Sequence, residues 1–147
     1  MRALGIDLGS RRIGVALSNS EGTLATPYEV VHRSGDRARD HRAIAAMAEE
    51  TDAEVVVVGL PLSLSGAVGT AAASAQAEAD ELATATGRPV DLWDERLTTV
   101  SADRHLLALD MKAPARRRVV DKVAAAVMLQ GWLDHQRLAR PHEDTDQ

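Results

Sequence analysis

Apolar and polar residues alternate through the first third of the chain, in the pattern of strands that bury one face. Residues 3–8 place leucine and isoleucine on one face, and glycine and Asp7 on the other. A second alternating run, 13–18, follows after a short turn, so the two runs predict a hairpin. A third strand is predicted over 23–32. Pro27 interrupts it and cannot donate a ladder hydrogen bond, so we expect this strand to lie at a sheet edge or to bend there.

The rest of the chain alternates between short apolar runs and longer segments of helical periodicity. Residues 54–59 contain four consecutive valines, which is typical of a parallel strand buried on both faces. Residues 90–93 predict a fifth strand. We expect four helices around these strands, over residues 36–51, about 70–86, about 98–109 and 119–135. The last helix is apolar on all sides at its centre, which predicts that it packs against the sheet.

This order of elements predicts an α/β domain with a five-stranded mixed sheet flanked by helices. Three consecutive antiparallel strands come first, and each of the next two strands follows a helix. This order matches the RNase H-like architecture. The corresponding spatial order is 3-2-1-4-5, and it places the first strand, with Asp7, in the middle of the sheet. We expect a single domain over 1–140, and a polar, frayed tail over 141–147.

Composition narrows the chemistry and the location. The 147 residues are 45% hydrophobic, which indicates one globular domain of ordinary size. The absence of cysteine excludes disulfide scaffolds, thiolate zinc sites and cysteine nucleophiles. No apolar run reaches the roughly 18 residues that span a membrane, so we expect a cytoplasmic protein with no membrane partner. Aromatic residues make up only 2%, which disfavours a base-stacking platform for single strands.

Positive charge is concentrated in one segment, although the net charge is −5. Five cations lie from Lys112 to Lys122, whereas the stretch 49–95 holds ten acids and one cation. We therefore expect a basic face that binds phosphates on an otherwise acidic protein, with a solvated charged loop as the alternative. The candidate nucleic-acid contacts are Arg11, Arg12, Arg96, Arg116, Arg117, Arg118 and Lys122.

Acidic residues lie at three places where a two-metal phosphodiesterase site would need them. Asp7 is on the first strand, Asp94 and Glu95 end the fifth, and Asp121 opens the last helix. Ligands gather at the carboxyl ends of strands in open α/β sheets, and converging carboxylates can hold two Mg²⁺ ions. Strand alternation allows only one of Asp94 and Glu95 to join such a site, and spacing leaves the choice open. Each acid alone could also cap a turn, lie exposed or favour a helix dipole.

Four stretches of the chain carry motifs that are familiar in this order and spacing. They are GIDLGSRRIGVALS at 5–18, VVGLPLSLSG at 57–66, DERLTTVSA at 94–102 and VVDKVAAAVMLQGWLD at 119–134. Over nearly its whole length the chain resembles the YqgF/RuvX family of RNase H-like nucleases. The resemblance implies that Asp7, Glu95 and Asp121 are the catalytic acids and the ligands of two Mg²⁺ or Mn²⁺ ions, and it favours Glu95 over Asp94.

The function that the resemblance implies is metal-dependent cleavage of nucleic acid. We expect the substrate to be the 5′ end of pre-16S rRNA. Resolution of four-way DNA junctions (Holliday junctions) is the alternative, and a non-catalytic nucleic-acid-binding protein is a third possibility. The first motif also resembles the phosphate loop of actin-like ATPases, which however need two such domains. Glycines around residues 9–12 should let phosphates approach the backbone. Monomer and homodimer both stay open.

Overall fold

The central feature of the molecule is a five-stranded mixed sheet. The structure is a computed structural model that describes residues 1–60, 69–94 and 113–138, with side chains from 121 onward in the last range. The strands are β1 (Ala3–Leu8), β2 (Arg12–Ser18), β3 (Ala25–His32), β4 (Val55–Leu60) and β5 (Val90–Asp94). Their order is β3-β2-β1-β4-β5, with β1 antiparallel to β2 and parallel to β4. The predicted order 3-2-1-4-5 is therefore confirmed.

The edge strand β3 carries the irregularity that its proline predicted. Pro27 pairs with Ala16, and the register of the β2–β3 ladder shifts between Val15 and Ala16. A proline that cannot donate to the ladder is tolerated there because, among the described strands, β3 has a neighbour on one side only.

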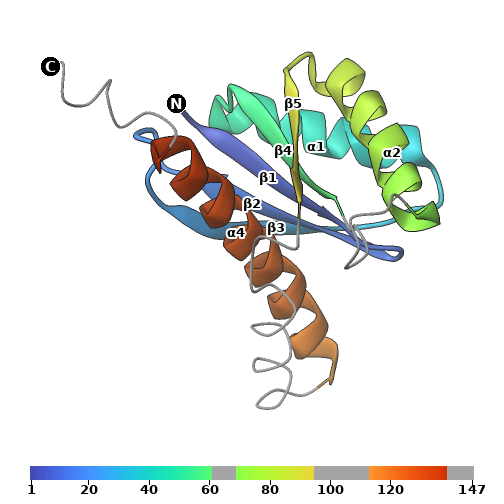
Figure 1. Cartoon of the computed structure of the whole chain (residues 1–147). Coiled ribbons are helices and arrows are strands. Elements are labelled where there is room, and N and C mark those ends of the chain that lie inside the picture. Colours follow the sequence, from blue (N-terminus) through green and yellow to red (C-terminus); the bar gives the residue numbers. More distant parts are fainter. Residues whose placement is uncertain (61–68, 95–112, 139–147) are drawn as a thin grey trace, which may run out of the picture.

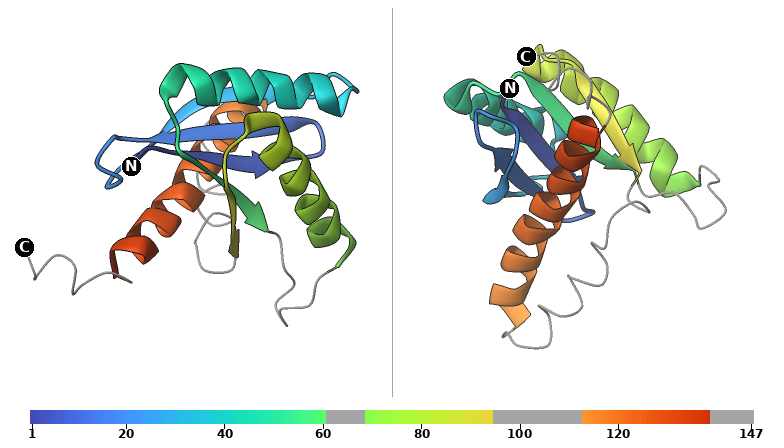
Figure 2. Two further views of the ribbon diagram at one scale, coloured as in Figure 1. Left: turned by 90° about the horizontal axis from the view of Figure 1, so that it is seen from above. Right: turned by 60° about the vertical axis from the view of Figure 1, so that its left-hand side comes forward.

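Helices cover both faces of the sheet. They are α1 (Arg37–Thr51), α2 (Thr70–Thr86) and α4 (Ala113–Leu138). Figure 1 and the left view of Figure 2 show α1 on one face and α4 crossing the other. Asp36 begins α1 by accepting hydrogen bonds from the amides of Ala38 and Arg39, and α2 ends at Gly87, whose φ of 66° suits glycine.

The start of α4 differs from the sequence prediction. The helix begins at Ala113, not at residue 119, so the backbone of Arg116, Arg117 and Arg118 belongs to the helix and not to a basic loop. Pro114 is compatible with this start, because the first turn of a helix needs no donor at its amide positions. The predicted helix over 98–109 and the tail over 141–147 lie outside the described residues.

Two apolar layers hold the helices to the sheet. On one face, buried side chains of β1, β2 and β4 pack against α1 and α2, and they include Leu4, Ile6, Ile44, Val58 and Leu82. On the other face, alternate residues of the same strands, including Ala3 and Val57, and Trp93 of β5 pack against Ala125 and Leu129 of α4. The four valines of β4 divide between the two layers, which explains why they form an unbroken apolar run. In the part of the chain that the structure describes, no helix is long and apolar enough to cross a bilayer.

Candidate active site

Asp7 lies near the carboxyl end of the central strand, on the face that α4 covers. Its ladder partner on β2 is Gly14, and cross-strand partners share a face of the sheet. Ile6 before it and Leu8 after it contribute to the opposite layer, against α1 and α2. Asp7 is partly buried, and it interacts with neighbouring groups. The prediction that this carboxylate is mid-sheet is confirmed.

Gly14 is the point at which α4 approaches the sheet most tightly. A Cβ added there would lie 2.1 Å from the backbone oxygen of Asp121 and 3.5 Å from the Cβ of Ala125. The clash with the helix backbone leaves no room for a side chain on β2 at this position, so the packing requires a glycine there. Gly14 is thus a common neighbour of Asp7, its ladder partner, and of the Asp121 backbone on α4.

The environment of Asp121 differs from the one predicted at a helix terminus. Because α4 begins at Ala113, Asp121 lies about two turns inside the helix, where the helix dipole no longer explains an acid. Its Oδ2 accepts a hydrogen bond from Nε of Arg12 at 2.6 Å, and the two side chains are 19% and 23% exposed. Arg12, predicted only as a phosphate contact, is therefore the direct ionic partner of a predicted metal ligand.

The structure describes one of the two acids at the end of β5 between which spacing left the choice open. Trp93 packs in the layer under α4, and Asp91 accepts a hydrogen bond from Nε1 of Trp132 on α4 at 2.7 Å. Asp94 is the ladder partner of Leu60, which packs toward α2 on the opposite face. Asp94 therefore lies on the face away from Asp7. Glu95 lies outside the described residues, as does Arg96.

The remaining predicted cations surround the site from different elements. Arg11 is exposed in the turn between β1 and β2, and Lys122 follows Asp121 and is partly buried. The other three, Arg116, Arg117 and Arg118, are about one turn before Asp121 on α4, where only the backbone is described. Their role as phosphate contacts stays a prediction.

The chemistry of the two carboxylates suits a hard divalent cation. Carboxylate oxygens are the ligands that Mg²⁺ takes in proteins, usually one or two of them with waters completing the shell. Among the described residues no group of three or more acidic, histidine or cysteine side chains is close enough to form a complete ligand set. Asp7 and Asp121 are therefore two candidate carboxylate ligands, and the third predicted ligand, Glu95, lies outside the described residues.

The glycine of the β1–β2 turn has a structural reason of its own. A Cβ on Gly9 would lie 2.5 Å from the backbone oxygen of Arg12, and the Gly9 amide donates to that same oxygen at 3.0 Å. Tight closure of the turn requires this glycine, and tight packing of α4 requires Gly14. The close approach of phosphates, which we expected these glycines to permit, is not needed to explain either of them.

A second polar cluster, which the sequence did not predict, lies beside this turn. Glu78 on α2 is 5% exposed and accepts two hydrogen bonds from the guanidinium of Arg33, at 2.9 and 3.0 Å. Nε2 of His41 on α1, 3% exposed, lies 2.7 Å from the same carboxylate. Burial alone would raise the pKa of Glu78, but the hydrogen bonds and charges of Arg33 and His41 outweigh it and hold the pKa below 4.5.

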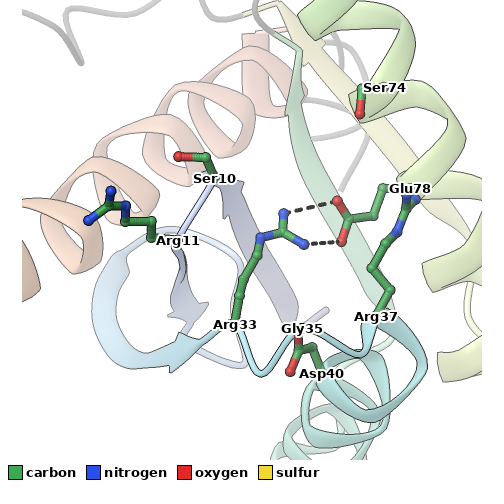
Figure 3. Close-up of a pocket in the computed structure, with 8 residues that line it drawn as sticks. All are labelled: Ser10, Arg11, Arg33, Gly35, Arg37, Asp40, Ser74 and Glu78. Atoms are coloured by element: carbon green, nitrogen blue, oxygen red, sulfur yellow. Dashed lines mark hydrogen bonds and ion pairs between the residues drawn. The ribbon is translucent and has the colours of Figure 1, made fainter.

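Arg33 and Glu78 of the cluster line a pocket of about 670 Å³. Figure 3 shows Arg33 directed at Glu78 across this pocket, with Ser10 and Arg11 of the turn on one side and Arg37 of α1 on the other. One feature of the sequence, which we did not use above, could have indicated such a cluster. Glu78 falls on the buried stripe of α2, where the neighbouring stripe positions are alanine and leucine, and a carboxylate there requires a partner.

Comparison with known proteins identifies the family. The family described as "RuvX: Holliday junction resolvase" matches residues 1–135. A relative from Myxococcus xanthus, named "Putative pre-16S rRNA nuclease", is 46% identical over 137 residues, which cover 93% of this chain and 90% of the relative. A relative of the same name from Mycolicibacterium paratuberculosis is 50% identical over 140 residues, which cover 94% and 83% of the two chains.

Solved structures support the fold. The RuvC protein of Thermus thermophilus, in a complex described as containing a Holliday junction substrate, superposes with a TM-score of 0.57 at 18% identity, covering 92% of this chain and 96% of that one. At this identity the similarity establishes the RNase H-like architecture alone. Taken with the match over residues 1–135, it confirms what the four motifs predicted: the chain belongs to the RuvX family.

Proposed function

We propose that this protein is a metal-dependent nuclease that processes the 5′ end of pre-16S rRNA. Family membership and the names of relatives that are 46–50% identical support the substrate class. The observation that carries the proposal is structural. Gly14 allows α4 to approach β2 closely. Asp7 is the ladder partner of Gly14, and the backbone of Asp121 lies against Gly14, although the two acids are 114 positions apart in sequence.

The proposed ligands of the divalent cations are Asp7, Asp121 and Glu95. Asp94 lies on the face of the sheet opposite to Asp7 and so cannot share a metal ion with it, which supports Glu95 as the third ligand. Two Mg²⁺ or Mn²⁺ ions, when bound, would activate the attacking water and stabilise the leaving oxygen. Partial burial of Asp7 and Asp121 keeps both carboxylates oriented by their elements and limits their movement.

Arg12 is proposed to balance charge at this site. Its guanidinium lies on the Asp121 carboxylate, so it partly offsets the repulsion that two neighbouring carboxylates exert on each other. It is also a planar donor that phosphates bind well, and it sits at the start of β2 next to the exposed Arg11. We propose that Arg11, Arg12, Lys122, Arg96 and the three arginines of α4 contact the substrate backbone, which would orient the scissile phosphate toward the acids.

Junction resolution is the second candidate function, because the family description names it. The test compares an RNA that carries the 5′ flank of 16S rRNA with a four-way DNA junction, each with Mg²⁺ or Mn²⁺. Wild type and Asp7→Asn are assayed in parallel. Cleavage of the RNA alone, lost in the variant, supports the proposal. Cleavage of the junction alone replaces it with resolution, and binding without cleavage of either substrate by folded wild type would indicate a non-catalytic protein.

A further inference from the structure

The buried cluster of Glu78, Arg33 and His41 lies outside the proposed ligand set. Its members come from α2, from the residue after β3 and from α1, so three elements meet at one carboxylate. A buried ion pair contributes little net stability, because removing two charges from water costs about as much as their attraction returns. The geometry of the pair is more informative than its energy. A bidentate Arg–carboxylate contact fixes the plane of the guanidinium, and so fixes where its third nitrogen points.

That third nitrogen holds the turn that follows Asp7. Nε of Arg33 donates to the backbone oxygen of Gly9 at 2.7 Å, and the backbone amide of Arg33 donates to the oxygen of Arg11 at 2.9 Å. The turn itself supplies one further hydrogen bond, from the Gly9 amide to Arg12. Two of these three hydrogen bonds therefore come from Arg33, and the one from Nε depends on the guanidinium orientation that Glu78 fixes (Figure 3).

The turn connects two groups of the proposed active site. Gly9 is two residues after Asp7, and the turn ends at Arg12, whose guanidinium pairs with Asp121. A change in the turn therefore moves the end of β1 and the start of β2 together. Arg33 borders a pocket of about 670 Å³, so without a carboxylate to hold it the guanidinium has room to turn toward solvent and release Gly9.

We infer that Glu78 is a positioning residue: through Arg33 it fixes the β1–β2 turn and thereby the placement of Asp7 and Arg12. This inference rests on the proposed function for its catalytic consequence. The effect of Glu78 on the geometry of the β1–β2 turn does not depend on that function. The carboxylate acts from the α2 side of the sheet on groups that face α4, and it is not one of the proposed metal ligands.

The test compares Glu78→Gln with Glu81→Gln. Both variants remove one carboxylate from α2 and keep its volume, and both remove an ion pair with an arginine. The difference is that the Glu81–Arg37 pair is about half exposed and holds no part of the turn. We expect Glu78→Gln to lower kcat about 10-fold or more, since displacements approaching 1 Å cost about 100-fold, and to raise KM for the nucleic acid by a smaller factor, because Arg12 is one of several proposed phosphate contacts. Glu81→Gln should match wild type in both constants.

Amide hydrogen exchange provides the readout that does not depend on cleavage. In Glu78→Gln, the amides of Gly9 and Arg33 should exchange faster, while those of β4 stay protected. A merely structural role would raise exchange across the sheet in proportion to lost stability. Uniform exchange, or turn amides that match Glu81→Gln, would overturn the inference. Arg33→Lys provides a second variant, because one ammonium cannot hold Glu78 and Gly9 together, and it should expose the same two amides. If wild type cleaves nothing, the proposed function fails while the exchange data still decide this inference.

Discussion

Substitution of Gly14 by alanine tests the contact on which the active site depends. The added Cβ would lie 2.1 Å from the backbone oxygen of Asp121, whereas real Cβ atoms essentially never approach another atom closer than 3.0 Å. The obstacle is helix backbone, which cannot rotate away as a side chain can. Strand β2 is paired on both sides, so α4 is the element that has to move.

The size of the movement follows from these distances. Reaching the 3.0 Å limit requires about 0.9 Å, and an ordinary contact at 3.4 Å requires about 1.3 Å. Overpacking of this kind costs about 1–3 kcal/mol, which a domain with about 5–15 kcal/mol of stability survives. A displacement near 1 Å between reacting groups costs about 100-fold in rate. We therefore expect Gly14→Ala to fold and to cleave about 100 times more slowly than wild type.

The assay is single-turnover cleavage with saturating Mg²⁺, together with thermal unfolding of each variant. Gly69→Ala is the neutral control, because its φ is negative and the described residues place no atom within 4 Å of the added Cβ. Gly5→Ala is the informative control. Its Cβ would lie 2.8 Å from the Cβ of Leu129 on the same helix, eight residues or about 12 Å beyond Asp121. It should lower the melting temperature as Gly14→Ala does, yet retain most of the cleavage rate.

Two results would refute this reasoning. One is a Gly14→Ala protein that unfolds at a lower temperature but cleaves at the wild-type rate, since Asp121 would then not need its observed distance from β2. The other is an equal loss of rate in Gly5→Ala and Gly14→Ala, which would show that general stability, and not the position of Asp121, limits cleavage.

Four further outcomes follow from the structure. Asp7→Asn and Asp121→Asn should each abolish metal-dependent cleavage with little change in melting temperature. Asp94→Asn, on the opposite face of the sheet, should retain activity. If Asp94→Asn loses activity and Glu95→Gln does not, Asp94 and not Glu95 is the third metal ligand. Arg12→Gln should tighten Mn²⁺ binding to the free protein, measured by calorimetry, because a cation beside Asp121 is removed, and should weaken nucleic-acid binding; weaker Mn²⁺ binding would show that the guanidinium supports the metal site. The pKa of Glu78 is lower in the folded than in the unfolded protein, so its contribution to stability is present above pH 4.5 and is lost as the pH falls through the folded value. Urea unfolding between pH 6 and 3 should therefore show less acid sensitivity in Glu78→Gln than in wild type, and equal slopes would contradict the assigned shift. Chelation of divalent metal by EDTA should stop cleavage reversibly, with added Mn²⁺ restoring it, and cleavage that persists in EDTA would exclude the proposed chemistry.

The sheet was predictable because its pattern is local. Alternation in β1 and β2, the valine run of β4 and the proline of β3 each report on burial or pairing of the residues that carry them. Once the strand order was inferred, the position of Asp7 followed from topology. Successive side chains of a strand point to opposite faces of the sheet, so the sequence showed that only one of Asp94 and Glu95 could face Asp7. It did not show which one.

The interactions that the sequence could not predict are those between distant elements. The contact of Arg12 with Asp121 joins residues 109 positions apart, and Arg33 with Glu78 spans 45 positions. Charge patterns along the chain do not specify such pairs, because many cations could reach each acid. The early start of α4 was missed for a related reason. Three consecutive arginines after a proline are equally compatible with a loop and with an exposed helical turn, and the sequence offers no burial pattern there to decide.

The most direct test of the account is a crystal structure with Mn²⁺, located by its anomalous scattering. The account predicts an Mn²⁺ ion bound by carboxylate oxygens of both Asp7 and Asp121, next to Gly14, and no ion at this position in Asp121→Asn crystals. An Mn²⁺ ion bound by other residues in an enzyme that cleaves its substrate, with Asp7 and Asp121 both free of metal, would contradict the central claim that α4 and β1 together build the catalytic metal site.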